Sequence, residues 1–123
     1  MKKKILLVSA IAALAYGLAA PVWAGAVLRA VVVETDDVAG YVEAIAEGKA
    51  IMKSVGMTSV VRVWQATYAG SNTGAVVVSV EWADMAAMAA DDAKIAASKE
   101  YQDWLASLDD IRTIVSDSLY AER

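Results

Sequence analysis

Residues 58–82 read TSVVRVWQATYAGSNTGAVVVSVEW and contain two runs rich in β-branched and aromatic residues. The first run covers 58–68, the second covers 75–82, and the six residues between them, AGSNTG, are typical of a turn. Two such runs joined by a short glycine-containing segment predict antiparallel strands connected as a β-hairpin.

The segments on either side of this hairpin extend the pattern. Residues 27–34 (VLRAVVVE) and 112–120 (RTIVSDSLY) predict two further strands. A first helix is expected from the start signal at 35–37 to Gly56, a residue suited to a left-handed helix end. A second helical stretch is expected from 84 to about 108; its apolar spacing slips near Ser98, which could cap a separate segment.

This order of elements predicts the ferredoxin-like βαββαβ arrangement, an α+β fold with a four-stranded antiparallel sheet and two helices on one face. Alternation along the strands gives one apolar face, which suits the helices. The opposite face is mixed, and it combines Arg62, Trp64, Tyr68, Val77, Ser79, Glu81, Ile114, Ser116 and Tyr120. Because so broad a partly apolar face is unusual on a monomer, we expect a homodimer that covers it and encloses an amphipathic cavity.

Several segments resemble the dimeric α/β-barrel superfamily, which includes antibiotic-biosynthesis-monooxygenase-like, NIPSNAP-like and stress-responsive barrel proteins. They are the tryptophan-containing hairpin, EWADM at 81–85, SKEYQDW at 98–104 and SLY at 118–120. The resemblance covers nearly all of residues 25–123 and implies a sheet-to-sheet dimer. For the monooxygenase-like branch it implies oxidation of phenolic or quinol substrates with no cofactor, neither metal nor flavin. The haem-degrading branch uses an axial histidine, which this chain lacks.

The candidate ligand-binding residues are Arg62, Trp64, Tyr68, Glu81 and Tyr120. Trp64 would supply an aromatic wall, Arg62 a positive charge and the tyrosines hydrogen-bond donors, which suits a planar phenolic or carboxylate-bearing molecule. Each residue also has a structural interpretation. Arg62 and Glu81 could form a cross-strand ion pair, and the aromatic side chains could be core or interface anchors.

Other polar features have simpler interpretations. Asn72, the single asparagine, is expected to be a turn residue. The acidic doublets at 36–37, 91–92 and 109–110 are explained by helix capping and solubility, and none has the spacing of a calcium loop. Met85 and Met88 are interpreted as core residues. We therefore expect no metal site.

The chain contains neither histidine nor cysteine. This composition excludes thiolate nucleophiles, disulfides and the histidine-dependent catalytic triads. Any catalysis must use carboxylates, Tyr, Lys, Arg, Ser or Thr.

Residues 1–24 have the pattern of a secretory signal peptide: three lysines, an uncharged run at 5–20 and a small residue at position 24. The alternative is an uncleaved membrane anchor. Cleavage would leave one domain, 25–123, that is periplasmic or secreted. Removing three of the 11 basic residues leaves 8 against 15 acidic ones, a net charge of −7, so nucleic acid and anionic membrane surfaces are not expected partners.

Three functions remain open at this point. The first is an exported, homodimeric α/β-barrel protein that binds a small aromatic or amphipathic molecule. The second is a cofactor-independent monooxygenase-like enzyme acting on a phenol or quinol. The third is a structural or stress-related dimer with no ligand.

Overall fold

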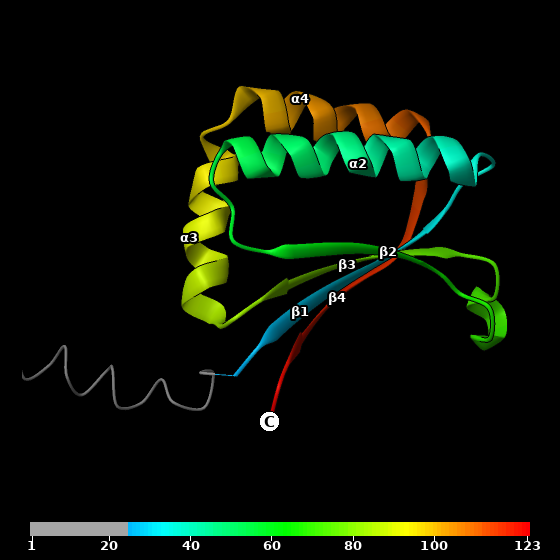
Figure 1. Cartoon of the computed structure of the whole chain (residues 1–123). Helices are drawn as coiled ribbons and strands as arrows, with labels where there is room; N and C mark the ends of the chain where they lie inside the picture. Colours follow the sequence, from blue (N-terminus) through cyan, green and yellow to red (C-terminus); the bar gives the residue numbers. More distant parts are fainter. Residues whose placement is uncertain (1–24) are drawn as a thin grey trace, which may run out of the picture.

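The structure is a computed structural model that describes residues 25–123; the expected signal peptide, 1–24, lies outside the described residues. Its helices and strands follow the predicted order, with the second helical stretch divided in two (Figure 1). They are β1 (Val27–Glu34), α2 (Val38–Ser54), β2 (Val60–Gln65), β3 (Val76–Trp82), α3 (Met85–Ala96), α4 (Lys99–Ser107) and β4 (Thr113–Ala121). Short 3₁₀ turns, η2 (Gly70–Asn72) and η3 (Leu108–Asp110), precede β3 and β4.

The strands form one antiparallel sheet in the order β2-β3-β1-β4. Helices α2 and α4 lie side by side over one face, and α3 is steeply inclined to them at one end of the sheet (Figure 1). No helix of residues 25–123 lies over the other face. The predicted α+β, ferredoxin-like fold is therefore confirmed.

Side chains at the helix starts explain where the helices begin. The carboxylate of Asp37 accepts a hydrogen bond from the backbone N–H of Gly40 at 2.9 Å, and that of Asp84 accepts one from Ala87 at 2.7 Å. The hydroxyl of Ser98 accepts one from the N–H of Tyr101 at 3.1 Å. Each bond satisfies an N–H group that has no partner within its own helix. The cap at Ser98 is the predicted start of a separate helix.

The core lies between the sheet and the helices. Its buried members are Val33, Tyr41, Ile45, Ile51, Met52, Val61, Val76, Val78, Tyr101, Trp104 and Leu108. Helices α2 and α4 approach closely at Gly48, where a Cβ atom would overlap the ring of Trp104. The indole N–H of Trp104 donates to the carbonyl of Ala44 at 2.8 Å, so this ring joins the two helices by packing and by a hydrogen bond.

Two details of the strands differ from the prediction. The strand expected to reach Tyr68 ends at Gln65, because Ala66 exchanges backbone hydrogen bonds with Gly74 and Ala75 and the chain then turns. The alternation predicted for β4 is also interrupted. A bulge lies where β4 passes Val32 and Val33, and it places Ile114 opposite the buried Val33. Ile114 therefore does not continue the mixed face as expected.

No helix among residues 25–123 is long and apolar enough to cross a membrane.

Candidate functional site

Four of the five predicted site residues lie on the side of the sheet away from the helices. Residues directly opposite each other on paired strands share a face. Glu81 is opposite Leu28, which is opposite Tyr120, so these three form one row across β3, β1 and β4. Arg62 and Trp64 are opposite Ser79 and Val77 on the same face. We call this surface the open face; it comprises Leu28, Ala30, Val32, Val60, Arg62, Trp64, Val77, Ser79, Glu81, Ser116, Ser118 and Tyr120.

The contacts on the open face are cross-strand and exposed. Arg62 Nη1 lies 3.8 Å from Glu81 Oε2, and the indole N–H of Trp64 donates to Ser79 Oγ at 2.8 Å. Trp64 is 53% exposed and Tyr120 is 57% exposed. Such an exposed ion pair contributes at most about 1 kcal/mol to stability. Within one chain Glu81 and Tyr120 line a pocket of about 260 Å³ together with Ala26, Leu28, Ala121 and Glu122. Arg62 and Trp64 are not among its walls, so the four predicted residues do not share one cavity.

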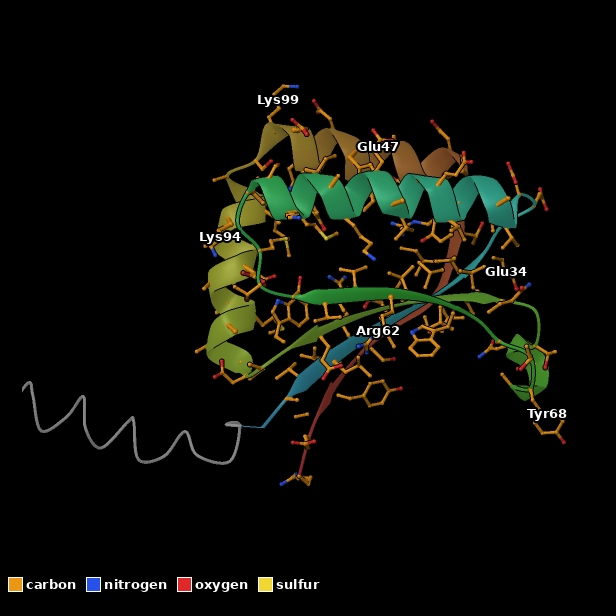
Figure 2. The ribbon with its side chains drawn as sticks, viewed as in Figure 1. Glu34, Glu47, Arg62, Tyr68, Lys94 and Lys99 are labelled. Carbon is orange, nitrogen blue, oxygen red and sulfur yellow. The ribbon has the colours of Figure 1, made fainter. Side chains whose placement is uncertain are left out.

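Tyr68 is not part of this group. It lies in the hairpin loop, is 99% exposed and projects away from the sheet, whereas Arg62 lies beneath the sheet on the side opposite the helices (Figure 2). The strand ends before Tyr68, so the alternation that placed its side chain on the mixed face no longer applies. Asn72 lies in the 3₁₀ turn of the same loop, as its interpretation as a turn residue predicted.

The helix side of the sheet carries a charged pair that the sequence analysis missed. Arg29 on β1 lies opposite Val80, and Asp117 on β4 lies opposite Val31, so both face the helices. Arg29 Nε donates to Asp117 Oδ1 at 2.9 Å, and Nη2 donates to Oδ2 at 2.5 Å. Alternation from the buried Val27 could have indicated that Arg29 shares the helix-facing side.

This pair lines a cleft between the sheet and α3, which we call the α3 cleft. Its volume is about 240 Å³, and its walls are Arg29, Trp82, Met88, Asp92, Asp117, Ser118 and Leu119. The walls therefore combine an indole, a thioether and an aliphatic side chain with three charged groups. Apolar walls with a few convergent polar groups are the usual composition of a small-molecule site.

Arg29 and Asp117 stabilise each other in their charged forms. The two hydrogen bonds from Arg29 hold the pKa of the Asp117 carboxyl below its usual range, although partial burial acts in the opposite direction. The same bonds raise the pKa of Arg29. Asp92 adds a second carboxylate, so the charged side chains that line the cleft carry one positive and two negative charges. The cleft therefore disfavours an anionic ligand.

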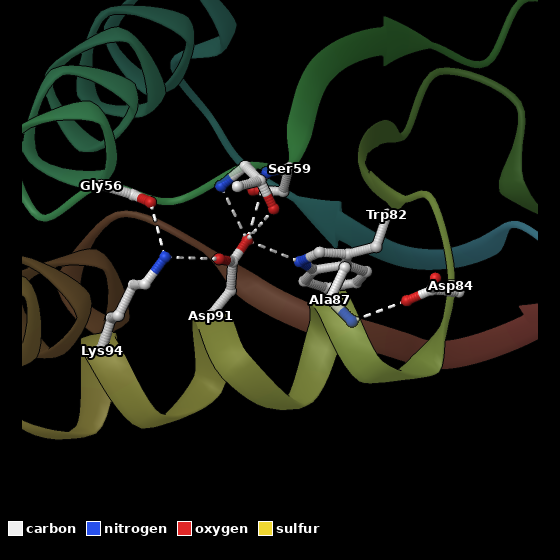
Figure 3. A network of polar contacts seen from close by, with 8 residues as sticks. Gly56, Ser59, Trp82, Asp84, Ala87, Asp91 and Lys94 are labelled. Atoms are coloured by element: carbon white, nitrogen blue, oxygen red, sulfur yellow. Dashed lines mark hydrogen bonds and ion pairs between the residues drawn. The ribbon is translucent and has the colours of Figure 1, made fainter. Parts of the chain in front are cut away.

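A second polar cluster, around Asp91, lies between α3, the segment before β2 and the end of β3 (Figure 3). Asp91 is fully buried. One of its oxygens, Oδ2, accepts bonds from the N–H groups of Thr58 at 2.9 Å and Ser59 at 3.1 Å, the Thr58 hydroxyl at 3.2 Å and the Trp82 indole at 2.9 Å. The other oxygen lies 3.5 Å from Lys94 Nζ. For the acidic doublet at 91–92, helix capping and solubility were the expected roles. That prediction was wrong for Asp91.

The Asp91 cluster joins α3 to the segment before β2 and to the end of β3. Burial acts to raise the pKa of Asp91, but the hydrogen bonds from Thr58 and Trp82 and the charge of Lys94 together lower it. Asp91 also fixes the indole of Trp82, whose side chain lines the α3 cleft. The cluster is thus structural and positions one wall of the cleft.

Residues 25–123 contain no group of three or more Asp or Glu side chains arranged to hold a metal ion.

The comparisons with known proteins identify a shared fold. No protein-family model matches the chain, and no curated protein matches it in sequence. Among solved structures, it is similar to SnoaB, a cofactor-independent oxygenase from Streptomyces nogalater, with a TM-score of 0.57, 16% identity and coverage of 81% of this chain and 95% of SnoaB. One of the two SnoaB structures is of an asparagine-to-alanine mutant.

A conserved protein of unknown function from Bacteroides thetaiotaomicron, described as a possible oxidoreductase, is similar to the same degree. Its TM-score is 0.57 and its identity 9%, and the match covers 80% of this chain and 99% of that chain. At these identities the similarity establishes the ferredoxin-like fold alone. It agrees with the fold expected from the resemblance to the barrel superfamily.

Proposed function

We propose that this protein binds a small, neutral phenolic molecule in the α3 cleft and is a homodimer closed through the open face. The observation that carries the proposal is the Arg29–Asp117 pair. Both of its side chains remain partly exposed, at 48% and 39%, on the helix side of the sheet, where the neighbouring Leu119 of β4 is exposed as well.

The pair has hydrogen-bonding capacity left for a ligand. A guanidinium has five N–H donors, of which Asp117 uses two, and each carboxylate oxygen can accept more than one bond. A phenolic hydroxyl can donate to Asp117 while it accepts from Arg29. The aromatic ring would then pack against Trp82 and Met88, since rings and thioethers form favourable contacts. The small volume favours a ligand of one or two rings.

The open face supports the dimer. Val60, Trp64 and Tyr120 are exposed large apolar side chains on it, and they surround a central row of small residues, Ser79, Ala30 and Ser118. A second copy of the sheet would bury the large side chains over the small ones. Replacing Val77 by Asp should split the dimer, because a carboxylate would be buried there without a partner. Light scattering at micromolar concentration tests this, and a monomeric wild-type protein would refute it.

A cofactor-independent oxygenase is the second candidate, and the similarity to SnoaB favours it. The electrons would come from the substrate itself. With 1-naphthol and O₂, one oxygen atom would enter the ring and the other would leave as water, which gives 1,4-naphthoquinone. An oxygen electrode measures this reaction separately from binding.

The binding test compares two arginines. We expect 1-naphthol to quench part of the tryptophan fluorescence of the wild-type protein, because Trp82 lines the cleft. Arg29→Gln should weaken binding at least tenfold by removing the charge-assisted donor, whereas Arg62→Gln, the matched change on the open face, should leave the affinity unchanged. Equal effects of the two variants would reject the α3 cleft as the site. Native mass spectrometry of the protein from its own source would show a retained ligand and the dimer together.

A further inference from the structure

We propose a second binding site, independent of the α3 cleft, which takes a small amphipathic carboxylate. It is the pocket between the C-terminal end of α2 and β2, which we call the lysine pocket. Its volume is about 340 Å³, and it is lined by Lys49, Ala50, Met52, Lys53, Met57, Ser59 and Val61.

The end of α2 builds the apolar floor of this pocket. Gly56 has φ = +82°, its N–H donates to the carbonyl of Lys53 at 3.1 Å, and the N–H of Met57 donates to that of Met52 at 3.0 Å. These two bonds form a Schellman motif, which turns the chain back on the helix and commonly brings the flanking apolar residues together. Both methionines and Val61 of β2 line the pocket. Methionine side chains adapt to ligands of different shape. Val61 belongs to the sheet and forms the fixed part of the floor.

The two lysines at the rim give the pocket its charge. Lys49 and Lys53 are four residues apart on α2 and therefore lie on the same side of the helix. Within residues 25–123, neither forms an ion pair, whereas Arg29, Arg62, Lys94 and Lys99 each form one with a carboxylate. Like charges at this spacing repel each other by about 0.2–0.5 kcal/mol. A bound anion would remove this repulsion, in a chain whose net charge is negative.

Ser59 supplies a further polar group. Its backbone N–H is held by Asp91 at 3.1 Å, so its position is fixed, and its hydroxyl is buried without a hydrogen-bond partner among the described residues. Burying such a group without a partner is unfavourable. A carboxylate oxygen in the pocket would accept from this hydroxyl once the Ser59 side chain rotates toward the ligand, because the hydroxyl oxygen has no exposed surface in the observed rotamer.

Together, an apolar floor and two lysines without an ion pair fit a carboxylate with a short alkyl chain. The charge distinguishes this pocket from the α3 cleft, where the two carboxylates disfavour an anion. The lysine pocket should therefore prefer anionic ligands, and the α3 cleft neutral ones.

Octanoate is the probe for this proposal. We expect it to shift the methyl NMR signals of Met52 and Met57, and we expect 1-octanol, which has the same chain without the charge, to bind at least tenfold more weakly. The K49Q/K53Q double variant should lose at least tenfold in octanoate affinity. Lys99→Gln, a matched change on α4, should lose nothing, and 1-naphthol binding should be the same in all three proteins.

The same titrations can overturn the proposal. Equal octanoate affinity in wild-type protein and K49Q/K53Q would show that the lysines only cover apolar surface with their alkyl chains. Methyl shifts at residues outside the pocket would show that octanoate binds elsewhere. Because both lysines are exposed, the double variant should remain folded, and its circular dichroism spectrum checks this.

Discussion

Asp91 and Asp117 are both carboxylates on the helix side of the sheet, and both have a lowered pKa, but their surroundings differ. Asp91 is sealed from solvent, and one of its oxygens accepts four hydrogen bonds from the protein. Asp117 accepts two bonds from one arginine and is 39% exposed. Asp91 Oδ1 has no hydrogen-bond partner among the described residues and lies 3.5 Å from Lys94 Nζ. A carboxylate bonded to the protein in a sealed interior contributes to stability, whereas one left partly open in a cleft can still bind a ligand.

Asp91→Ala should produce the largest loss of stability. The substitution leaves the N–H groups of Thr58 and Ser59 and the indole N–H of Trp82 without their acceptor. Leaving one buried and two partly buried donors unpaired should lower the free energy of unfolding by about 3–5 kcal/mol. Urea denaturation measures this. Asp92→Ala, the matched change at the neighbouring residue, should cost at most about 0.5 kcal/mol. Equal losses of stability in the two variants would contradict the structural role of Asp91.

Gly48→Ala tests the close contact between α2 and α4. The added methyl group would overlap the Trp104 ring and force α2 and α4 apart, so the free energy of unfolding should fall by about 1–3 kcal/mol. Ala50→Gly on the same helix is a control for helix propensity, expected to cost about 1 kcal/mol. A Gly48→Ala variant as stable as the wild type would show that the two helices are not in close contact.

Lowering the pH should remove the contribution that Asp91 makes to stability. Because the pKa of Asp91 is lower in the folded than in the unfolded chain, its contribution to stability is complete at neutral pH. That contribution should decrease as the pH falls below about 4, the ordinary pKa of the unfolded carboxyl, toward the folded value. Urea denaturation from pH 7 to pH 3 should show a shallower loss in Asp91→Asn than in the wild type. Parallel curves would mean that Asp91 is not the titrating group.

Asp117→Asn should have a small effect on stability and a clear effect on binding. Its partly exposed pair with Arg29 contributes at most about 1 kcal/mol. The substitution removes the charged acceptor proposed for a phenolic hydroxyl, so 1-naphthol affinity should fall at least fivefold. Denaturation and fluorescence titration on one preparation separate the two effects. A loss of stability as large as that of Asp91→Ala would place Asp117 in the structural group instead.

Much of the fold could be predicted because its signals are local. The β-branched runs at 27–34 and 75–82, the cap at Ser98 and the glycine at the end of α2 depend on residues close together in the sequence. Tyr68 was misplaced because the end of β2 depends on backbone bonds between Ala66 and the far side of the loop.

The interior polar groups could not be predicted in the same way. The burial of Asp91 depends on the segment before β2, more than 30 residues away, which supplies its donors. The Arg29–Asp117 pair joins residues 88 positions apart, which the pairing of β1 with β4 brings together. Charge and alternation indicate the face on which such residues lie, but only the tertiary structure brings them together.

The most direct test of the α3 cleft is a ¹H–¹⁵N NMR titration with 1-naphthol that follows three side-chain signals. We predict that the Arg29 Nε–H and the Trp82 indole N–H will shift together with one dissociation constant, because both groups belong to residues that line the cleft. The Trp64 indole N–H, which is bonded to Ser79 on the open face, should not shift. Saturable shifts at Trp64 with no change at Arg29 and Trp82 would contradict the account and place the ligand on the open face.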